Sequence, residues 1–327
     1  MDFLKHKYLF LIISLVIIVG GITYGLITGY RFDIDFKGGT SIQVDLNEEY
    51  DNSDIQNLVK EVTKEAPLVQ KVTGGNNAVS ITTETISMEE VDTIVSKLQE
   101  KYPNMGEAST KNVQPNYGKE LINSALLAIT VSVAIILIYI AIRFKTLGFS
   151  AAITAIIGLI HDAAFLIALY GIFKLPINST FVAVILTIIG YSINDTIIVY
   201  DRIRENRKKV SLSKDLKETI NLSLSQTITR TIYTSLTTVM AIGTVYVFAL
   251  VYNQQVLKEF SLPLIIGILV GTYSSMFIST SLWYLIESKV SSKKKLYRED
   301  YDGIFTRIFR SNYRNYPSDN YFNNCNC

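Results

Sequence analysis

Six long apolar stretches, each almost free of charge, alternate with more polar segments along the chain. Each stretch is close to the roughly 20 residues that an α-helix needs to cross about 30 Å of hydrocarbon. We therefore predict a polytopic α-helical membrane protein with six transmembrane helices. The predicted spans are Tyr8–Thr28, Leu121–Ile142, Leu147–Phe173, Ile177–Val199, Ile232–Tyr252 and Ser261–Ile286.

The long segment between the first two spans has a different pattern. Short runs in which apolar and polar residues alternate, as in half-buried strands, are separated by segments with helical spacing. The predicted strands are Thr40–Leu46, Leu68–Thr73, Ala78–Thr83 and Gly106–Val113, and the predicted helices are Ser53–Glu65 and Met88–Lys101. This βαββαβ order predicts a ferredoxin-like α+β domain between helices 1 and 2. Because the segment contains neither His nor Cys, we expect a binding or lever role rather than catalysis.

Composition supports a membrane protein, and the distribution of charge adds an orientation. Of the 327 residues, 49% are apolar, and the mean hydropathy of +0.27 is too high for an ordinary soluble domain. Basic residues cluster at the N-terminus, at 143–146, at 202–230 and after residue 288. By the positive-inside rule, both termini are cytosolic and the α+β domain is extracytoplasmic. The predicted parts are an anchor helix (1–29), the α+β domain (30–119), a five-helix bundle (120–287) and a cytosolic basic and aromatic tail (288–327).

The two ends of the chain limit other interpretations. The basic residues before the first span resemble a signal peptide, but the apolar run is longer than the roughly 7–15 residues of such a peptide, so we expect an uncleaved anchor. Both cysteines, Cys325 and Cys327, lie in the last three residues. We therefore expect no disulfide framework, metal site or other cofactor in the folded body.

The segment DIDFKGGT, residues 33–40, joins the first span to the α+β domain. Gly38 and Gly39 allow a turn with positive φ or a close approach of the backbone. We predict that Asp35, Gly38 and Gly39 form a structural hinge or cap, with ligand binding as the alternative. Gly190, in the fourth span, is a further candidate for a structural position.

The fourth span carries Asn194 and Asp195 in an otherwise apolar run. An ionised Asp in hydrocarbon costs at least about 2.5–3.5 kcal/mol, so it is a functional candidate that needs a partner. Asp195 lies about 9 Å along the axis inside the predicted cytosolic end. Tyr191, Thr187 and Ser192 lie on the same side of the helix by spacing, which predicts a polar face toward the bundle interior or water.

Arg230 opens the fifth span, and Thr234, Thr237 and Thr238 follow it on one side of the helix. Because the fourth and fifth spans are predicted antiparallel neighbours, Arg230 can pair with Asp195 and hold it ionised until something displaces it. A static salt bridge, or an Arg that extends to the lipid headgroups, is the alternative.

The third span contains the adjacent residues His161 and Asp162. A histidine in a membrane can relay protons because its reference pKa is near neutrality. It can equally be a hydrogen-bonding group between helices. The sequence leaves both roles open.

Four segments resemble signatures of the SecF family of Sec-dependent protein export. In this chain, LTIIGYSINDTIIVYDRIREN (Leu186–Asn206) resembles the family's fourth-span signature. QTITRTIYTSLTT (Gln226–Thr238) resembles its fifth-span signature. The third-span motif is similar to GLIHD (Gly158–Asp162), and the motif after the first span to DFKGGT (Asp35–Thr40). The resemblance covers about residues 8–290. Asp33 departs from it, because the family usually has Gly at that position.

The resemblance implies an RND-like half-transporter that SecD completes, associated with the SecYEG channel and often YajC. Such a unit uses proton flow through the bundle to move its outer domains and draw unfolded exported polypeptide outward after SecA has acted. The resemblance places the proton path at Asp195, Arg230, Asn194, His161, Asp162 and Thr234. It further implies a location in the cytoplasmic membrane, contact with lipid, and no enzymatic activity, cofactor or nucleic-acid partner.

These observations lead to the hypothesis that Asp195 is a proton-carrying switch in the late steps of protein export. Protonation would neutralise Asp195, weaken its attraction to Arg230 and favour a second packing of the helices. Two other functions are compatible with the sequence. One is an RND-type exporter of lipids or small molecules, and the other is a passive scaffold in which both residues only hold helices together.

Overall fold

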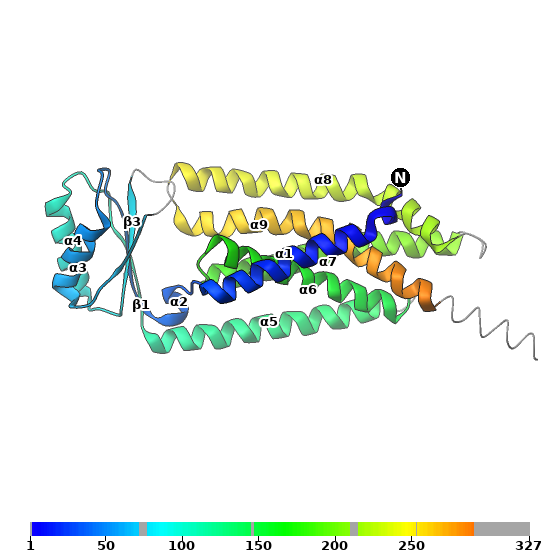
Figure 1. The fold of residues 1–327 in the computed structure, drawn as a ribbon, viewed down its shortest axis with the longest axis horizontal. Coiled ribbons are helices and arrows are strands. Elements are labelled where there is room, and N and C mark those ends of the chain that lie inside the picture. Colours follow the sequence, from blue (N-terminus) through cyan, green and yellow to red (C-terminus); the bar gives the residue numbers. More distant parts are fainter. Residues whose placement is uncertain (1, 72–76, 145–146, 210–214, 253, 291–327) are drawn as a thin grey trace, which may run out of the picture.

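A computed structural model describes residues 2–71, 77–144, 147–209, 215–252 and 254–290. The molecule is elongated, with an α+β domain at one end and long helices along the rest of its length (Figure 1). We call the end of the helical bundle next to this domain the domain end, and the opposite end the far end. The predicted tail from residue 291 onward, including Cys325 and Cys327, lies outside the described residues.

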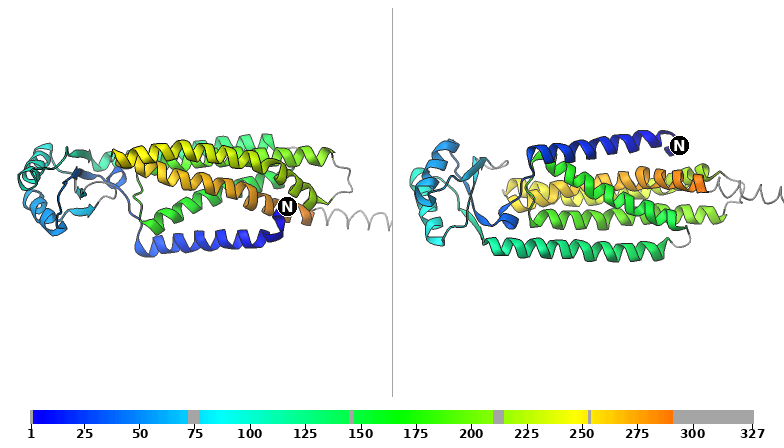
Figure 2. Two further views of the ribbon diagram at one scale, coloured as in Figure 1. Left: turned by 90° about the horizontal axis from the view of Figure 1, so that it is seen from above. Right: turned by 60° about the horizontal axis from the view of Figure 1, so that its bottom comes forward.

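The prediction of six transmembrane helices is confirmed, because six helices in the described residues are long and apolar enough to cross a membrane. The first five are α1 (Lys7–Thr28), which follows the short helix η1 (Phe3–His6), α5 (Pro115–Arg143), α6 (Phe149–Phe173), α7 (Ser179–Lys209) and α8 (Leu216–Val251). The sixth helix consists of α9 (Gln255–Tyr273), the π-helix η2 (Ser274–Ser279) and a last segment that ends at Val290. In the right-hand view of Figure 2, α1 and α5 lie at opposite edges of the bundle.

Three of these helices form the interior of the bundle. In α6, α7 and the sixth helix, 56%, 50% and 56% of the most apolar window is buried, compared with 17%, 6% and 11% in α1, α5 and α8. The apolar side chains exposed on the outer helices are therefore available to lipid or to another membrane helix. The predicted acidic residues of the third and fourth spans lie on α6 and α7, in the buried part.

Much of the segment between the predicted fourth and fifth spans is helical. Helix α7 continues to Lys209 and α8 begins at Leu216, so the two form a long helical hairpin at the far end (Figure 2). Asn206 donates hydrogen bonds to Ser223 at 2.8 Å and to Gln226 at 2.9 Å across this hairpin. These paired polar groups, together with buried apolar residues, stabilise helix beyond the purely apolar windows.

The α+β domain follows the predicted βαββαβ order, which is confirmed. Its elements are β1 (Gly39–Asp45), α3 (Asn52–Thr63), β2 (Leu68–Lys71), β3 (Ala78–Thr83), α4 (Met88–Lys101) and β4 (Ser109–Val113). The strand order is β2-β3-β1-β4, and all neighbours are antiparallel. Helices α3 and α4 cover the face of the sheet that points away from the bundle (Figure 1). Ile42, Ile81, Ile55 and Ile94 are fully buried between these helices and the sheet.

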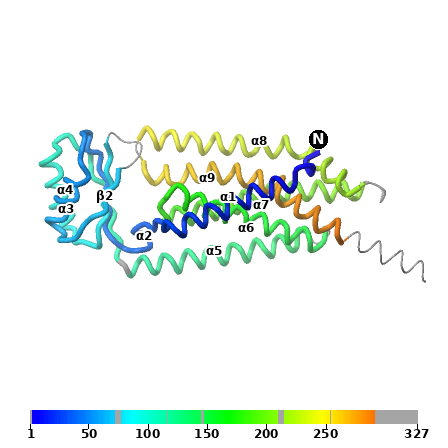
Figure 3. Tube along the Cα trace, viewed as in Figure 1, coloured from blue at the N-terminus to red at the C-terminus, as the bar shows by residue number. Residues whose placement is uncertain are grey.

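The chain enters and leaves this domain next to the bundle. A short helix that the sequence did not predict, α2 (Ile34–Lys37), joins α1 to β1, and β4 runs almost directly into α5. The trace in Figure 3 shows both connections at the domain end. The domain is thus attached covalently to α1 and α5, whereas the acidic residues of the interior lie on α6 and α7.

Candidate functional site

Asp195 is completely buried within the bundle, on the uninterrupted helix α7. Its Oδ2 atom accepts a hydrogen bond of 3.3 Å from the Thr272 hydroxyl of α9. Its Oδ1 atom is buried and has no hydrogen-bond partner within the described residues. A carboxylate with one free buried oxygen is poorly compensated, and it can gain a proton without breaking an existing bond.

A short series of hydroxyl groups leads away from this carboxylate. The hydroxyl oxygens of Thr272 and of Ser235 on α8 lie 2.6 Å apart. The Ser235 hydroxyl in turn accepts a 3.3 Å hydrogen bond from the Tyr191 hydroxyl. The Thr272 hydroxyl is also 3.0 Å from the Ile268 carbonyl. Because a hydroxyl has one hydrogen, Thr272 donates to Asp195, to Ile268 or to Ser235 at any moment. An ionised Asp195 attracts this hydrogen more strongly than a neutral carboxyl would, so its charge influences which acceptor Thr272 uses.

Asp162 on α6 is also buried, but its carboxylate is fully hydrogen-bonded. Its Oδ2 atom accepts bonds from the hydroxyls of Ser192 on α7 and, at 2.8 Å, Ser274 of η2. Its Oδ1 atom lies 3.0 Å from Nδ1 of His161, whose Nε2 is buried without a hydrogen-bond partner in the described part of the chain. Asp162 thus joins the three buried helices, and the sequence-adjacent pair is also a contact in space.

The π-helix η2 brings several hydroxyls of the sixth helix into this region. Ser275 donates to the Ser192 carbonyl at 3.1 Å and lies 2.8 Å from the Thr196 hydroxyl. An added Cβ atom at Gly158 of α6 would be 2.2 Å from the Ser279 hydroxyl, so α6 and η2 are in close contact. π-Helical turns are rare and are often found at functional sites. Here the turn places serines between the helices that carry the two buried acids.

The structure does not form the direct Asp195–Arg230 pair that the sequence predicts. Arg230 is exposed on α8, and no ion pair or hydrogen bond joins it to Asp195 within the described residues. Its positive charge is nevertheless close enough to interact with that carboxylate electrostatically. The difference arises from the rotation of α8, because the next residue, Thr231, faces the interior instead. One residue corresponds to about 100° around a helix, which turns Arg230 away from the interior.

Four other residues that the sequence singled out also lie outside the buried hydrogen-bond network. Asn194 is exposed on α7, and an added Cβ atom at Gly190 would meet no atom within 4 Å. Thr234 is partly exposed and donates to the carbonyls of Arg230 and Thr231 at 3.0 and 2.9 Å. Thr187 is likewise exposed, so the predicted single polar face of α7 is wrong. Its members divide between the surface and the interior.

The glycines of the linker have the backbone that only glycine adopts readily. Gly38 and Gly39 have φ values of +77° and +135°, and an added Cβ at Gly39 would lie 2.7 Å from the Thr83 carbonyl oxygen. Asp35 is 2% exposed and contacts both the domain and α7.

We predict that Gly39→Ala destabilises the full chain by about 1–3 kcal/mol, because the new methyl group meets a strained φ and a backbone oxygen. The measurement is the midpoint of heat-induced loss of monodisperse protein in detergent. Gly20→Ala in α1 is the matched control, since an added Cβ there meets nothing within 4 Å. Equal midpoints for the two variants would contradict the prediction.

Sequence reasoning missed the partners supplied by the last two helices. Four of the residues that contact the acids or their neighbours were not candidates, namely Thr272, Ser274, Ser275 and Ser235. The available signal was the hydroxyl-rich run GTYSSMFISTS, residues 271–281, inside an apolar span. No group of three or more His, Cys, Asp or Glu that could hold a metal occurs within the described residues.

Six membrane-spanning helices, an α+β domain inserted after the first of them and acids buried within the bundle define a multi-pass membrane protein of the transport type. A family profile described as "Protein export membrane protein SecD/SecF, C-terminal" matches residues 93–289. The chain is also 32% identical over 305 residues to the protein translocase subunit SecF of Alicyclobacillus acidocaldarius, covering 91% of this chain and 96% of that protein. The chain belongs to the SecD/SecF family of protein export membrane proteins.

Longer relatives contain a region similar to this chain. The protein translocase subunit SecDF of Bacillus subtilis is 34% identical over 287 residues, which cover 86% of this chain and 37% of that protein. The crystal structure of SecDF from Thermus thermophilus, a translocon-associated membrane protein, matches with a TM-score of 0.76 and 28% identity. That match covers 88% of this chain and 39% of the other, so this chain spans well under half the length of either SecDF protein.

Proposed function

We propose that this chain acts in protein export as the SecF-type half of a SecD–SecF unit. The observation that carries this proposal is its similarity to SecF over 96% of that protein's length, combined with a match to 39% of a SecDF chain. The two halves that SecDF contains in one polypeptide would here be two chains, this chain and a SecD partner. The SecYEG channel, and YajC and SecA less directly, are further proposed partners, with unfolded exported polypeptide as the substrate.

The exposed polar groups of α7 and α8 support a partner of this kind. Arg230 and Asn194 are exposed on two membrane-spanning helices, and Gly190 leaves open space beside them. A cation within a span faces a bundle interior or water rather than lipid, and small residues allow close helix packing. We place the SecD helices on this face, where they would enclose Arg230 together with Asp195.

We predict that Gly190→Leu reduces the amount of SecD copurified from native membranes by about tenfold, equivalent to about 1.4 kcal/mol. The leucine would occupy space that the partner's helix needs, whereas no atom of the described residues lies within 4 Å of an added Cβ there. Gly20→Leu on α1, which is equally free of neighbours, is the control and should copurify SecD normally. Undiminished recovery with Gly190→Leu would place SecD elsewhere, and absence of SecD from the wild-type preparation would refute the proposed unit.

The proposed energy source is the proton motive force. Protonation of Asp195 removes the charge that attracts Thr272, whose hydroxyl can then donate to Ile268 instead. This change biases the packing of α7, α8 and α9 between two arrangements. One charge crossing 100 mV releases about 2.3 kcal/mol, and a shift from 1:99 to 99:1 needs about 5.5 kcal/mol. About two to three protons per cycle are therefore required.

The proposed orientation follows from the basic residues of the connections. The far end of the bundle would lie on the cytosolic side of the cytoplasmic membrane, the α+β domain would lie outside, and the basic residues predict that both termini are cytosolic. The chain would act as a transport subunit rather than an enzyme. The test is export into inverted membrane vesicles with and without a proton gradient. Export that is equal in both conditions with the wild-type complex would refute the proton-driven function.

A further inference from the structure

We infer that Asp35 transmits movement of α7, the helix that carries Asp195, to the α+β domain. This inference rests on the proposed proton-driven function, because it concerns how a change at Asp195 reaches the outer domain. Asp35 is a positioning residue in this scheme. It takes no part in carrying the proton.

A buried carboxylate connects the two parts. The Oδ2 atom of Asp35 accepts hydrogen bonds from the backbone amide of Ser179 at 2.9 Å and from its hydroxyl at 2.6 Å. Ser179 is the first residue of α7, where the helix leaves its first amides without internal partners. The Oδ1 atom of Asp35 forms an ion pair with Lys111 of β4, the edge strand of the sheet. Asp35 thus binds the start of α7 and the sheet at once.

The surroundings of this carboxylate are held firmly. Residues before α2 and α7 pair like strands, with hydrogen bonds from Asp33 to the Ile177 carbonyl at 3.1 Å and from Ile177 to the Arg31 carbonyl at 2.8 Å. On the other side, an added Cβ at Gly118 of α5 would lie 2.9 Å from the Phe36 carbonyl oxygen. Helix α2 therefore packs closely between α5 and the start of α7. A displacement of α7 cannot be absorbed by slack in this segment.

Helix α7 itself can carry a displacement from one end to the other. Asp195 follows Ser179 on the same uninterrupted helix, about 24 Å along the axis at about 1.5 Å per residue. A continuous helix moves as one rigid element, so a tilt or shift at Asp195 also moves Ser179. Asp35 then pulls Lys111, and with it the edge of the sheet.

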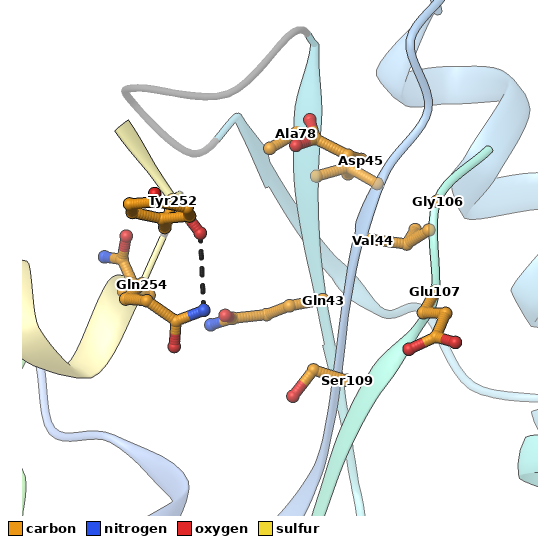
Figure 4. Close-up of a pocket in the computed structure, with 11 residues that line it drawn as sticks. Gln43, Val44, Asp45, Ala78, Gly106, Glu107, Ser109, Tyr252 and Gln254 are labelled. Atoms are coloured by element: carbon orange, nitrogen blue, oxygen red, sulfur yellow. Dashed lines mark hydrogen bonds between the residues drawn. The ribbon is translucent and has the colours of Figure 1, made fainter. Parts of the chain in front are cut away.

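Elsewhere, hollows separate the sheet from the bundle. One cavity of about 300 Å³ has Gln43 and Ser109 of the sheet on one side and Tyr252 and Gln254 of the α8–α9 connection on the other (Figure 4). A second, of about 400 Å³, is lined by sheet residues such as Ser80 and by Glu259 of α9. The domain therefore has room to tilt relative to the helices. A movement applied at Lys111 can change its angle, while the attraction between Asp45 of β1 and Lys258 of α9 still holds the two parts together.

The ionisation of Asp35 fits a permanent link better than a switch. Burial raises the pKa of this carboxyl, but the bonds from Lys111 and Ser179 outweigh burial and leave the pKa below its usual value. A group with a lowered pKa contributes stability above its ordinary range, and that contribution is lost only as pH falls through the folded-state pKa. The carboxylate therefore stays ionised at neutral and mildly acidic pH, where Asp195 is proposed to take up its proton.

The test uses the complex with its SecD partner in proteoliposomes, with Cys325 and Cys327 replaced by serine. Three quantities are measured with and without a proton gradient. The first is protonation of Asp195, seen as an infrared difference band that Asp195→Asn removes. The second is the distance between spin labels at the exposed positions Ser96 of α4 and Ser225 of α8. The third is gradient-stimulated export.

For Asp35→Ala we expect the infrared band to remain while the gradient-dependent distance change and the stimulated export are lost. Lys111→Gln, which leaves the bonds to Ser179 in place, should give the same result, and the double variant should add nothing further. Asp35→Glu should restore part of the distance change. Asp33→Ala is the matched control, because Asp33 is a neighbouring acid that makes no capping bond to α2.

Two results would overturn the inference. One is a full distance change and normal stimulation in Asp35→Ala. The other is loss of the infrared band in Asp35→Ala together with the distance change and the stimulated export, since Asp35 would then be needed only for folding of the bundle. Failure of the proposed function looks different, because the wild-type complex itself would show neither the band nor stimulated export.

Discussion

Asp195→Asn is expected to abolish the gradient-stimulated part of export while leaving assembly with SecD intact. The amide keeps the size of the carboxyl group and can still accept a hydrogen bond from Thr272, so the packing of α7 against α9 is preserved. Unlike the carboxyl group, the amide cannot take up and release a proton. Export into inverted vesicles, with and without a proton gradient, measures the stimulated part directly.

Two further variants separate loss of the proton from loss of structure. Asp195→Glu retains a titratable group and should keep part of the stimulation. Asp215→Asn changes an acid that caps α8 outside the apolar window and should leave export unchanged. Full stimulation in Asp195→Asn would mean that Asp195 only helps to pack the helices. The passive-scaffold function would then be the better explanation.

The membrane helices and the small sheet could be predicted from hydrophobic patterns that have few alternative interpretations. A run of about 20 apolar residues has few alternatives to a span, and alternation with a period of two residues favours a strand. The positions of Asp195 and of the His161–Asp162 pair in buried helices could be anticipated for the same reason, because ionisable groups inside a span avoid lipid. The roles of these residues could not be anticipated, because they depend on which hydrogen-bond donors surround each carboxylate oxygen.

The rotation of each helix was the main quantity that the sequence left undetermined. In a soluble protein the apolar face marks the interior, but in a membrane the lipid-facing side is apolar too. Arg230 and Thr231 are both polar and adjacent, and only the packing of α8 shows that Thr231 is the inner one. The π-helix η2 was missed because a local change of helical pitch leaves no mark in hydrophobic periodicity.

The two buried acids differ in how their carboxylate oxygens are hydrogen-bonded. Asp195 has an oxygen without a partner, whereas both oxygens of Asp162 have partners, from Ser192, Ser274 and His161. The Asp162 carboxylate therefore serves as the common acceptor for donors from three helices, and its removal would leave them unpaired. Of the two roles that the sequence left open for the His161–Asp162 pair, this geometry supports the hydrogen-bonding one.

Asp162→Leu is therefore expected to lower stability strongly, whereas Asp162→Asn should preserve both assembly and gradient-stimulated export. Leucine leaves the Ser192 hydroxyl without its acceptor at the contact of three helices, and the Ser274 hydroxyl with only the Gly271 carbonyl, at a cost of about 1–3 kcal/mol. Asparagine retains one acceptor oxygen for them and costs less than about 1 kcal/mol. The thermal midpoint of the purified complex and the vesicle export assay measure the two effects. If Asp162→Asn were as stable as the wild type yet lost all stimulation, Asp162 would belong to the proton path, and hydrogen bonding alone would not account for its burial.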